Sequence, residues 1–383
     1  MGRLSDLQTA LYRAMEEQGL WPADSPWVRH VAETYPRDQF APPRLWRWTG
    51  QDYEAVDRAV DPEGWGRLLY AGPYESTVTQ VTDGLPTSSL SCESVVADML
   101  DSLLLQPGHA TLELGAATGR NARLLAAQAG PDRVVSVEYD PQLAATATAN
   151  VEATGGGVEI RVGDGDLGAP AGGPYDRVIS TYAVETVPWA WVEQTCPGGR
   201  IVSPWGRLGH VALRVAADGQ SARGWIQGLA MFMPSRGRAV TLSWEQVCEG
   251  HPVAAEAPCA LDLVLLHENA NVLFGLRVIR PDLQVRTAAT EHGRVAWVHD
   301  GRFSWARIEQ NGQGAAVAQQ GGPRRLADEL TSGWREWQEA GAPEVYDFGL
   351  TRTPEAQYVW AHHSETGPRW GHRELTTTNG LAA

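Results

Sequence analysis

The sequence predicts an α/β fold with a doubly wound parallel sheet, and three observations support this prediction. Between residues 110 and 205, short apolar segments with strand character alternate with helical patterns. Such alternation is typical of parallel sheets, whose strands are joined by helices. Hydrophobic residues make up 43% of the chain and charged residues 20%, as in proteins with folded cores. The length of 383 residues is sufficient for two domains.

The predicted elements follow in a regular order. Short helices are expected at 5–18 and 27–34, and residues 43–75, rich in Trp, Gly and Pro, look irregular. Apolar residues at helical spacing predict a helix over 92–105, which Pro107 and Gly108 end. The alternating region then predicts strands at 110–115, 133–139, 157–164, 175–181 and 200–205, and helices at 119–129, 141–153 and around 188–196.

The pattern changes after residue 208. It consists of short β-like segments at 209–216, 222–232, 261–266, 272–280, 294–299 and 302–308, with one amphipathic helix near 323–340. We expect some of these strands to extend the sheet and the rest to form a β-rich second unit. Four parts are therefore predicted: an N-terminal helical and irregular segment (1–75), an α/β core (76–208), a C-terminal β-rich extension (209–363) and a disordered tail (364–383).

Charge and composition exclude several classes of function. The formal net charge is −15 and no basic patch stands out, so we expect no nucleic-acid partner. The chain contains no lysine, which excludes Schiff-base and P-loop lysine chemistry. There is no apolar run long enough for a membrane span and no signal-peptide core. The four cysteines match no zinc pattern, so we expect no metal site, free thiols and a cytoplasmic protein.

A glycine-containing loop and two acidic residues indicate a nucleoside cofactor. The stretch LELGAATGR (112–120) lies between a strand and a helix, where backbone amides can face a ligand. Glu138 ends the second strand, from which an acid can accept both ribose hydroxyls. NAD and S-adenosylmethionine both satisfy these two features. Asp164 follows the third strand and favours S-adenosylmethionine, although a helix cap is an equally good interpretation of that residue alone.

The stretch TSSLSCES (87–94) is rich in hydroxyl groups and directly precedes the predicted helix at 92–105. Ser89 or Ser91 would make a good cap for that helix. The same hydroxyls could hold a polar substrate, and both interpretations can be true together. Cys92 has no histidine near it in the sequence, so we interpret it as a packing residue rather than a nucleophile.

Several motifs together resemble the protein-L-isoaspartate O-methyltransferase family, in the family's order, over residues 25–235. They are PRDQF (36–40), SLS (89–91), LELGAATG (112–119), SVEYD (136–140), GDGDLGAPAGGPYDRVIS (163–180) and VEQTCPGGRIVSPWG (192–206). The resemblance implies a Rossmann-like methyltransferase fold that uses S-adenosyl-L-methionine and releases S-adenosyl-L-homocysteine. It implies that Ser91 lies beside the methyl-accepting carboxylate and is the catalytic residue. The implied cofactor contacts are Ser88, Ser89, Gly115, Ala116, Gly119, Glu138, Asp164 and Gly165.

The sequence departs from the family's pattern in three places. Cys92 and Glu93 stand where Gln-Pro or Ala-Pro usually follows the loop serine. Ala117 replaces a central glycine of the first cofactor motif, and Arg120 stands where the family often has an aromatic residue. These departures bear on the substrate more than on the fold.

The chain continues for well over a hundred residues beyond this region and resembles a longer branch of the family, which occurs with the biosynthesis of ribosomally made peptides such as graspetides, lanthipeptides and lasso peptides. The resembling segments are DGLPTSS (83–89), Val-Pro-x-Ala-Trp (187–191) and GGPRRLADEL…W (321–337). The branch implies methylation of a normal aspartate in a modified, macrocyclic precursor peptide, followed by aspartimide formation. Repair of isoaspartyl proteins and non-catalytic peptide binding remain as alternatives. The sequence leaves the peptide class, the modified aspartate and the oligomeric state open.

Overall fold

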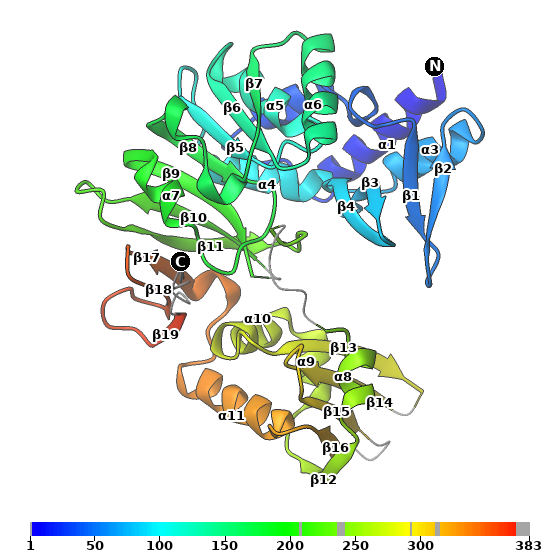
Figure 1. Cartoon of the computed structure of the whole chain (residues 1–383), viewed down its shortest axis with the longest axis vertical. Helices are drawn as coiled ribbons and strands as arrows, with labels where there is room; N and C mark the ends of the chain where they lie inside the picture. Colours follow the sequence, from blue (N-terminus) through cyan, green and yellow to red (C-terminus); the bar gives the residue numbers. More distant parts are fainter. Residues whose placement is uncertain (1, 207–208, 236–241, 292, 311–314, 373–383) are drawn as a thin grey trace, which may run out of the picture. The chain divides into compact units, whose positions relative to one another are not determined.

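The computed structural model describes residues 2–206, 209–235, 242–291, 293–310 and 315–372, and Figure 1 shows the chain as a ribbon. It contains two compact units. The first is Met1–Arg236 with Arg352–Pro354, and the second is Gly237–Thr351 with Glu355–Ala383. Both helices and sheets are present in each unit, so the predicted α/β class is confirmed.

The first unit is built on a mixed sheet whose strands run in the order β11-β10-β9-β8-β5-β6-β7. Strands β5 to β9 pair with one another in parallel, whereas β10 pairs antiparallel with both β9 and β11. The order reverses between β5 and β8, which is where such sheets bind ligands. The strands are β5 (Thr111–Leu114), β6 (Val134–Glu138), β7 (Val158–Val162), β8 (Tyr175–Ser180), β9 (Thr195–Trp205), β10 (Gly209–Val215) and β11 (Ala222–Leu229).

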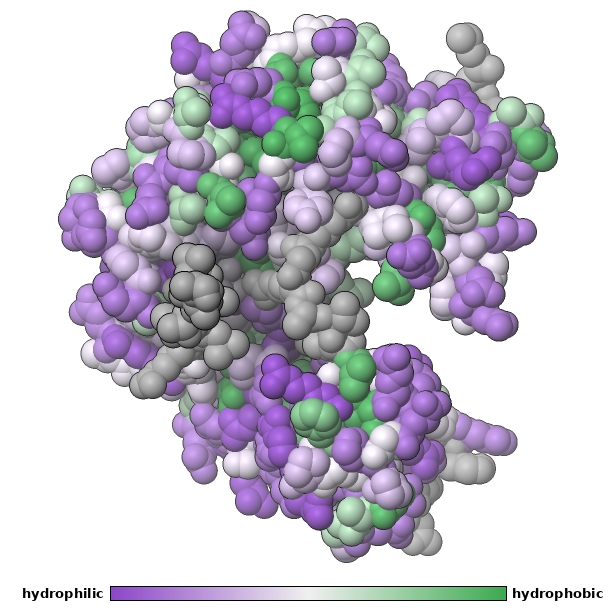
Figure 2. Space-filling model, in the orientation of Figure 1, coloured by the Kyte–Doolittle hydropathy of each residue, from purple (hydrophilic) through white to green (hydrophobic). Residues whose placement is uncertain are grey.

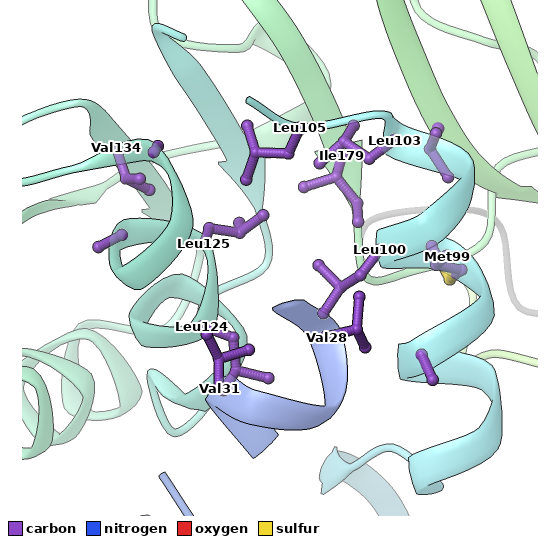
Figure 3. Close-up of a cluster of buried hydrophobic side chains, with 14 of the residues drawn as sticks. Val28, Val31, Met99, Leu100, Leu103, Leu105, Leu124, Leu125, Val134 and Ile179 are labelled. Carbon is purple, nitrogen blue, oxygen red and sulfur yellow. The ribbon is translucent and has the colours of Figure 1, made fainter. Parts of the chain in front are cut away.

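A shared apolar core joins three helices to this sheet. Figure 3 shows side chains of α2 (Trp27–Thr34), α4 (Glu93–Leu103) and α5 (Arg120–Ala129) pointing toward one another and toward Ile179 of β8. Each buried side chain of this size stabilises the fold by roughly 1.5–3 kcal/mol. Because the core anchors α4, it also fixes the residues that precede this helix.

The other helices of the first unit are α1 (Gly2–Glu17), α3 (Pro62–Leu69), α6 (Pro141–Ala153) and α7 (Trp189–Glu193). The predicted helices at 5–18, 27–34, 92–105, 119–129 and 141–153 are therefore confirmed. The helix expected around 188–196 is shorter than predicted, because strand β9 already begins at Thr195.

Residues 43–75 are not irregular, as the sequence had indicated. They contain β1 (Arg44–Trp48), β2 (Tyr53–Asp57) and α3. With β3 (Thr77–Thr82) and β4 (Leu85–Leu90), the first two strands form a sheet of order β2-β1-β3-β4. Both early strands have five residues and bury few side chains, chiefly Leu45 and Val56, so their alternation is too brief to stand out.

The first unit also extends past residue 208, where the sequence had placed the end of the α/β core. Strand β10 pairs with β9 on one side and with β11 on the other. The strands predicted at 209–216 and 222–232 are therefore confirmed, and they extend the first sheet, as expected for some of the strands after residue 208.

The second unit contains an antiparallel sheet of order β12-β16-β15-β14-β13. Its helices are α8 (Trp244–Gly250), α9 (Leu263–Glu268), α10 (Ala270–Ile279) and α11 (Leu326–Glu339). The sheet strands are β12 (Val253–Cys259), β13 (Gln284–Thr290), β14 (Gly293–His299), β15 (Trp305–Gln310) and β16 (Ala316–Gly321). Three strands follow near the end of the chain: β17 (Phe348–Arg352), β18 (Gln357–Ala361) and β19 (Arg369–His372).

Two strand predictions in this unit are wrong, because 261–266 and 272–280 lie in helices α9 and α10. Short apolar runs do not separate a buried helix from a buried strand. Both helices have a side-chain N-cap. Asp262 accepts a hydrogen bond from Leu265 N at 2.9 Å, and Asn269 accepts one from Asn271 N at 2.9 Å. The segments at 294–299, 302–308 and 323–340 are confirmed as β14, β15 and α11. The predicted tail is not wholly disordered, since β19 pairs with β18, and residues 373–383 lie outside the described residues.

Hydrophilic residues dominate the surface visible in Figure 2, with hydrophobic residues scattered among them. The large exposed hydrophobic side chains include Tyr74, Leu85, Leu229 and Met231. Within the described ranges, no helix combines the length and apolar character that crossing a membrane requires.

Candidate active site

A cavity of about 830 Å³ lies in the first unit, at the carboxyl ends of β5, β6 and β8. Parallel α/β sheets bind ligands at this edge, and the volume falls within the roughly 300–1,000 Å³ that is usual for small-molecule sites. Eight of the nine predicted site residues line it: Ser88, Ser89, Ser91, Gly115, Ala116, Glu138, Asp164 and Gly165. Gly119 lies just outside this wall.

The loop between β5 and α5, residues 115–119, is called the cofactor loop here. Gly115 has φ 97° and Gly119 has φ 84°, in the left-handed region that favours glycine. A Cβ on Gly115 would lie 2.4 Å from Thr181 Oγ1, and one on Gly119 would lie 2.9 Å from Ala147 O. Gly115 therefore keeps the cavity open, whereas Gly119 allows α5 to begin close against α6. Ala117, between them, has a φ of 48° without being glycine.

Glu138, at the end of β6, is fixed by two backbone amides. Its Oε2 accepts from Ala117 N at 2.8 Å, and its Oε1 accepts from Asp140 N at 3.0 Å. A carboxylate has about four acceptor positions, so both oxygens can also accept ribose hydroxyls from the cavity. This geometry agrees with the expected ribose contact, which stays a prediction.

Asp164 and Gly165 follow β7. Asp164 caps the short 3₁₀ helix Gly165–Leu167 by accepting from Asp166 N at 2.9 Å. The helix-cap interpretation is therefore correct, and Asp164 also lines the cavity. A Cβ on Gly165 would lie 2.5 Å from the hydroxyl of Tyr182, so only glycine leaves room there.

Glu113 lies buried beneath the cofactor loop, on β5. Burial raises the pKa of Glu113 to about 7, and the negative charge of Glu138 adds to this, whereas hydrogen bonds from Ser136 and Asn121 oppose it. Because the carboxyl of Glu113 is largely protonated below neutral pH, it repels the negative charge of Glu138 less than a carboxylate would.

Residues 87–92, which we call the acceptor loop, run along the cavity from β4 to α4. Ser88 is anchored in the hairpin, where its Oγ accepts from Thr79 Oγ1 at 3.0 Å. Helix α4 begins at Glu93 with Cys92 as its N-cap, and no side-chain capping bond is found there among the described residues. The interpretation of Ser89 or Ser91 as the cap is therefore wrong. Both serines instead line the cavity.

Two residues that depart from the family's pattern, Glu93 and Arg120, form an ion pair with each other. Arg120 Nη1 and Nη2 donate to the two carboxylate oxygens of Glu93 at 2.9 and 2.8 Å. Burial would raise the pKa of Glu93, but the charges and hydrogen bonds of Arg120 and Arg37 outweigh it and hold this pKa below its ordinary value. Cys92, which departs from the pattern together with Glu93, lines the cavity as a free thiol 3.6 Å from Ser94 Oγ.

Sequence reasoning missed two parts of the wall. Thr181 and Tyr182 follow β8, and the hydroxyl of Tyr182 donates to Asp166 Oδ1 at 2.9 Å. Their place at the carboxyl end of a parallel strand could have identified them. The segment Leu229–Ser235 begins at the last residue of β11 and is held to the chain that follows β8, because Ala183 N donates to Met233 O at 2.8 Å. No local signal marks this segment, since β10 and β11 must first return the chain to the cavity.

Apolar and aromatic side chains make up much of the wall, including Trp21, Tyr53 and Tyr74 and, from the segment after β11, Met231 and Phe232. Such a surface can contact side chains of a peptide and keep water from the reacting groups. No group of three or more His, Cys, Asp or Glu side chains in the described ranges could hold a metal ion.

These features fit S-adenosylmethionine. Gly115 leaves room beside Thr181 that a side chain would fill, Glu138 lines the cavity with its carboxylate, and the space continues to the acceptor loop. The residues present could therefore hold the nucleoside at one end and leave the other end to an acceptor.

The family model described as protein-L-isoaspartate(D-aspartate) O-methyltransferase (PCMT) matches residues 53–234. Protein-L-isoaspartate O-methyltransferase 1 of Anaeromyxobacter sp. is 35% identical over 210 residues, which cover 54% of this chain and 84% of that protein. The protein-L-isoaspartate O-methyltransferase of Methanopyrus kandleri is 41% identical over 121 residues, or 31% of this chain. The chain spans about half the length of that relative (54%) and of the Aeropyrum pernix relative (46%).

A solved structure titled protein-L-isoaspartate O-methyltransferase has a TM-score of 0.51 and 18% identity, and covers 90% of this chain and 96% of that chain. At this identity the likeness supports the fold alone. The expected methyltransferase fold is confirmed, and the expected enzyme class and cofactor are those of the matched family. The chain belongs to the protein-L-isoaspartate(D-aspartate) O-methyltransferase family.

Proposed function

We propose that this protein is an S-adenosylmethionine-dependent O-methyltransferase that esterifies the side chain of an aspartate in a modified, macrocyclic ribosomal peptide. The observation that carries this proposal is one cavity lined by both Glu138 and Ser91. Methyl transfer requires donor and acceptor to be held in near contact and in line. A single cavity shared by a cofactor loop and a hydroxyl-rich loop supports such an arrangement.

The acceptor needs no general base. An aspartate carboxyl has a pKa near 3.9, so it is already ionised at neutral pH. S-adenosylmethionine supplies an electrophilic methyl group carried on a sulfonium. A carboxylate oxygen bonds to the methyl carbon as the sulfur–carbon bond breaks, which leaves a methyl ester and S-adenosylhomocysteine. In this proposal Ser91 donates a hydrogen bond to the other carboxylate oxygen and orients it without taking its charge.

The ester is then activated toward cyclisation. The next backbone nitrogen of the peptide attacks the ester carbonyl, the nitrogen loses its proton, and the methoxy group leaves as methanol. The product is an aspartimide. A macrocycle that holds this nitrogen near the ester would favour the step by proximity.

The second unit supports a specialised substrate. Gly237–Thr351 has a sheet of its own and lies beyond residues 53–234, which match the family model. An enzyme that repairs many linear sequences gains nothing from a further recognition unit. We therefore propose that the second unit, which makes up most of the expected extension 209–363, binds the precursor peptide. Four free thiols agree with a cytoplasmic setting for this biosynthesis.

Repair of isoaspartyl proteins is the second candidate. The names of the relatives favour it, because they are protein-L-isoaspartate O-methyltransferases. The two candidates share the cofactor and the ester, and differ in the peptide that enters the cavity.

Intact-mass measurement separates these functions. The whole chain is incubated with S-adenosylmethionine and either a linear isoaspartyl peptide or macrocyclic peptides that carry a normal aspartate. We expect methyl gain followed by net loss of water on a macrocyclic peptide, and in Ser91→Ala the same mass changes should appear more than about tenfold more slowly. Methylation of the linear peptide would establish repair-type specificity instead. Calorimetry that detects no binding of S-adenosylmethionine would leave only a non-catalytic peptide binder.

A further inference from the structure

We infer that Glu93 is a positioning residue that couples the cofactor loop to the acceptor loop, through Arg120 on one side and Arg37 on the other. Occupation of the cofactor site would thereby set the position of Ser91. The inference rests on the proposed function for the identity of the two ligands, and it concerns how the two halves of the cavity communicate.

The link to the cofactor loop is direct. Arg120 is the first residue of α5 and follows Gly119, the last residue of that loop. Its guanidinium makes the two-point contact with Glu93, and its Nε donates to Tyr35 O at 3.1 Å. Paired guanidinium and carboxylate hydrogen bonds fix both distance and angle. A shift of the cofactor loop therefore moves the carboxylate that begins α4.

The link to the acceptor loop runs through Arg37. Its Nη1 donates to Ser91 O at 2.6 Å and lies 3.6 Å from Glu93 Oε2. Its Nη2 donates to Leu90 O at 3.3 Å and Thr77 Oγ1 at 3.0 Å. One guanidinium thus holds two successive carbonyl oxygens of the acceptor loop while it contacts the carboxylate that Arg120 binds.

The three charged residues are almost completely removed from solvent. Arg37 is 1% exposed, Glu93 1% and Arg120 4%. A buried ion pair adds little stability compared with apolar side chains of similar volume, so stability alone does not account for this cluster. What it provides is a short, rigid connection between segments at positions 37, 93 and 120, of which the last also lines the cavity.

Hydrogen exchange on the whole chain tests the coupling without any turnover. S-adenosylhomocysteine is the probe, and the readout is exchange of the backbone amides at 91–96, which excludes the expected cofactor contacts Ser88 and Ser89. We expect this ligand to slow the exchange of these amides several-fold in the native protein. In the double variant Glu93→Leu with Arg120→Met, it should still protect the cofactor loop but should leave 91–96 unchanged. This double variant removes both partners of the Glu93–Arg120 pair together, so neither is left as an unpaired buried charge. Arg37 loses its carboxylate partner but keeps its hydrogen bonds to backbone carbonyl oxygens.

Two further variants keep the test decisive. Arg37→Met retains the Glu93–Arg120 pair and removes the hydrogen bonds of Arg37 to the acceptor loop, so it too should lose the response at 91–96. It also removes the hydrogen bonds of Arg37 to Leu69 O and Thr77 Oγ1. Arg123→Met is the matched control. Arg123 lies on the same helix and contacts Tyr35 and Thr154 instead, so the response should persist.

The outcomes separate this inference from the proposed function. Absence of S-adenosylhomocysteine binding to the native protein would remove both. Binding without protection of 91–96 would overturn the coupling alone, and so would equal protection of 91–96 in the native protein and Arg37→Met. In turnover, the double variant should lower kcat by more than about tenfold while KM for S-adenosylmethionine changes little, as expected for lost alignment.

Discussion

At the residue scale, Ser91 is the side chain on which methyl transfer should depend most. If its hydroxyl orients the acceptor carboxylate, Ser91→Ala should slow transfer by more than about tenfold, or roughly 1.4 kcal/mol in the activation barrier. Ser91→Thr keeps a hydroxyl and should recover much of the rate. Single-turnover methylation measures both. Because Cys92 and not Ser91 is the N-cap of α4, the thermal midpoint should change little, and unchanged turnover in Ser91→Ala would assign the serine no role in the reaction.

Ala117 should carry local backbone strain. Its φ of 48° lies in the left-handed region, which costs a residue with a Cβ about 1–2 kcal/mol. Ala117→Gly should therefore raise the free energy of unfolding by about 1 kcal/mol. The neighbouring Ala116→Gly is the control, and it should lower stability because it adds freedom to the unfolded chain and removes a buried methyl group. Denaturant titration of both variants decides, and a destabilised Ala117→Gly would contradict this account.

Glu113 should make the stability of the protein depend on pH. Its pKa is raised from an ordinary 4.5 to about 7 by burial, so the folded state binds its proton more tightly than the unfolded state. The resulting stabilisation is complete below about pH 4.5 and is lost as the pH rises through about 7.

Glu113→Gln removes this titration. Its unfolding free energy, measured relative to the native protein, should therefore rise between about pH 4.5 and 7 and then level off. Glu159→Gln, on strand β7, is the control. Arg161 lowers the pKa of this exposed carboxyl, so the stability difference from the native protein should not change over the same pH range. A constant difference between Glu113→Gln and the native protein over this range would show that Glu113 titrates normally.

At the element scale, the segment Leu229–Ser235 should bind the peptide rather than the cofactor. Met231 lines the cavity and is 82% exposed, so a peptide can bury it. Met231→Asp should raise KM for the peptide by about tenfold, the effect of losing roughly 1.4 kcal/mol of apolar contact. Calorimetry should find the affinity for S-adenosylhomocysteine unchanged. Leu85→Asp, an exposed leucine at the start of β4 outside the cavity wall, should leave both values unchanged.

The elements also show what sequence could predict. The predicted elements from β5 to β8 were correct because each strand is a compact apolar run, and because proline or glycine marks where several helices begin or end. Helices α9 and α10 were mistaken for strands because their caps, Asp262 and Asn269, were outweighed by the apolar runs that follow. The pair between Glu93 and Arg120 could not be predicted either, because each residue alone only departed from a pattern, and folding joins them across 27 positions.

At the scale of the whole molecule, the limits of the two units determine which experiment is informative. Removal of 209–383 would delete β10, β11 and the cavity wall at Leu229–Ser235, so loss of activity would say nothing about recognition. A cut after residue 236 would still remove Arg352, which belongs to the first unit. Its fully buried side chain donates through Nε to Val187 O at 2.7 Å. Peptide recognition must therefore be mapped on the intact chain.

We expect a macrocyclic peptide to slow hydrogen exchange in two places on that chain. One is the wall of the cavity in the first unit, because the acceptor aspartate must reach Ser91. The other is the second unit, between residues 242 and 351, because the proposed recognition unit must bury backbone or side chains of the peptide. S-adenosylhomocysteine alone should protect only the first unit, which separates the two ligands within one experiment. If a peptide is methylated while hydrogen exchange in the second unit stays unchanged, then the cavity alone recognises the peptide. That outcome would remove the second unit as an argument against the repair-type candidate.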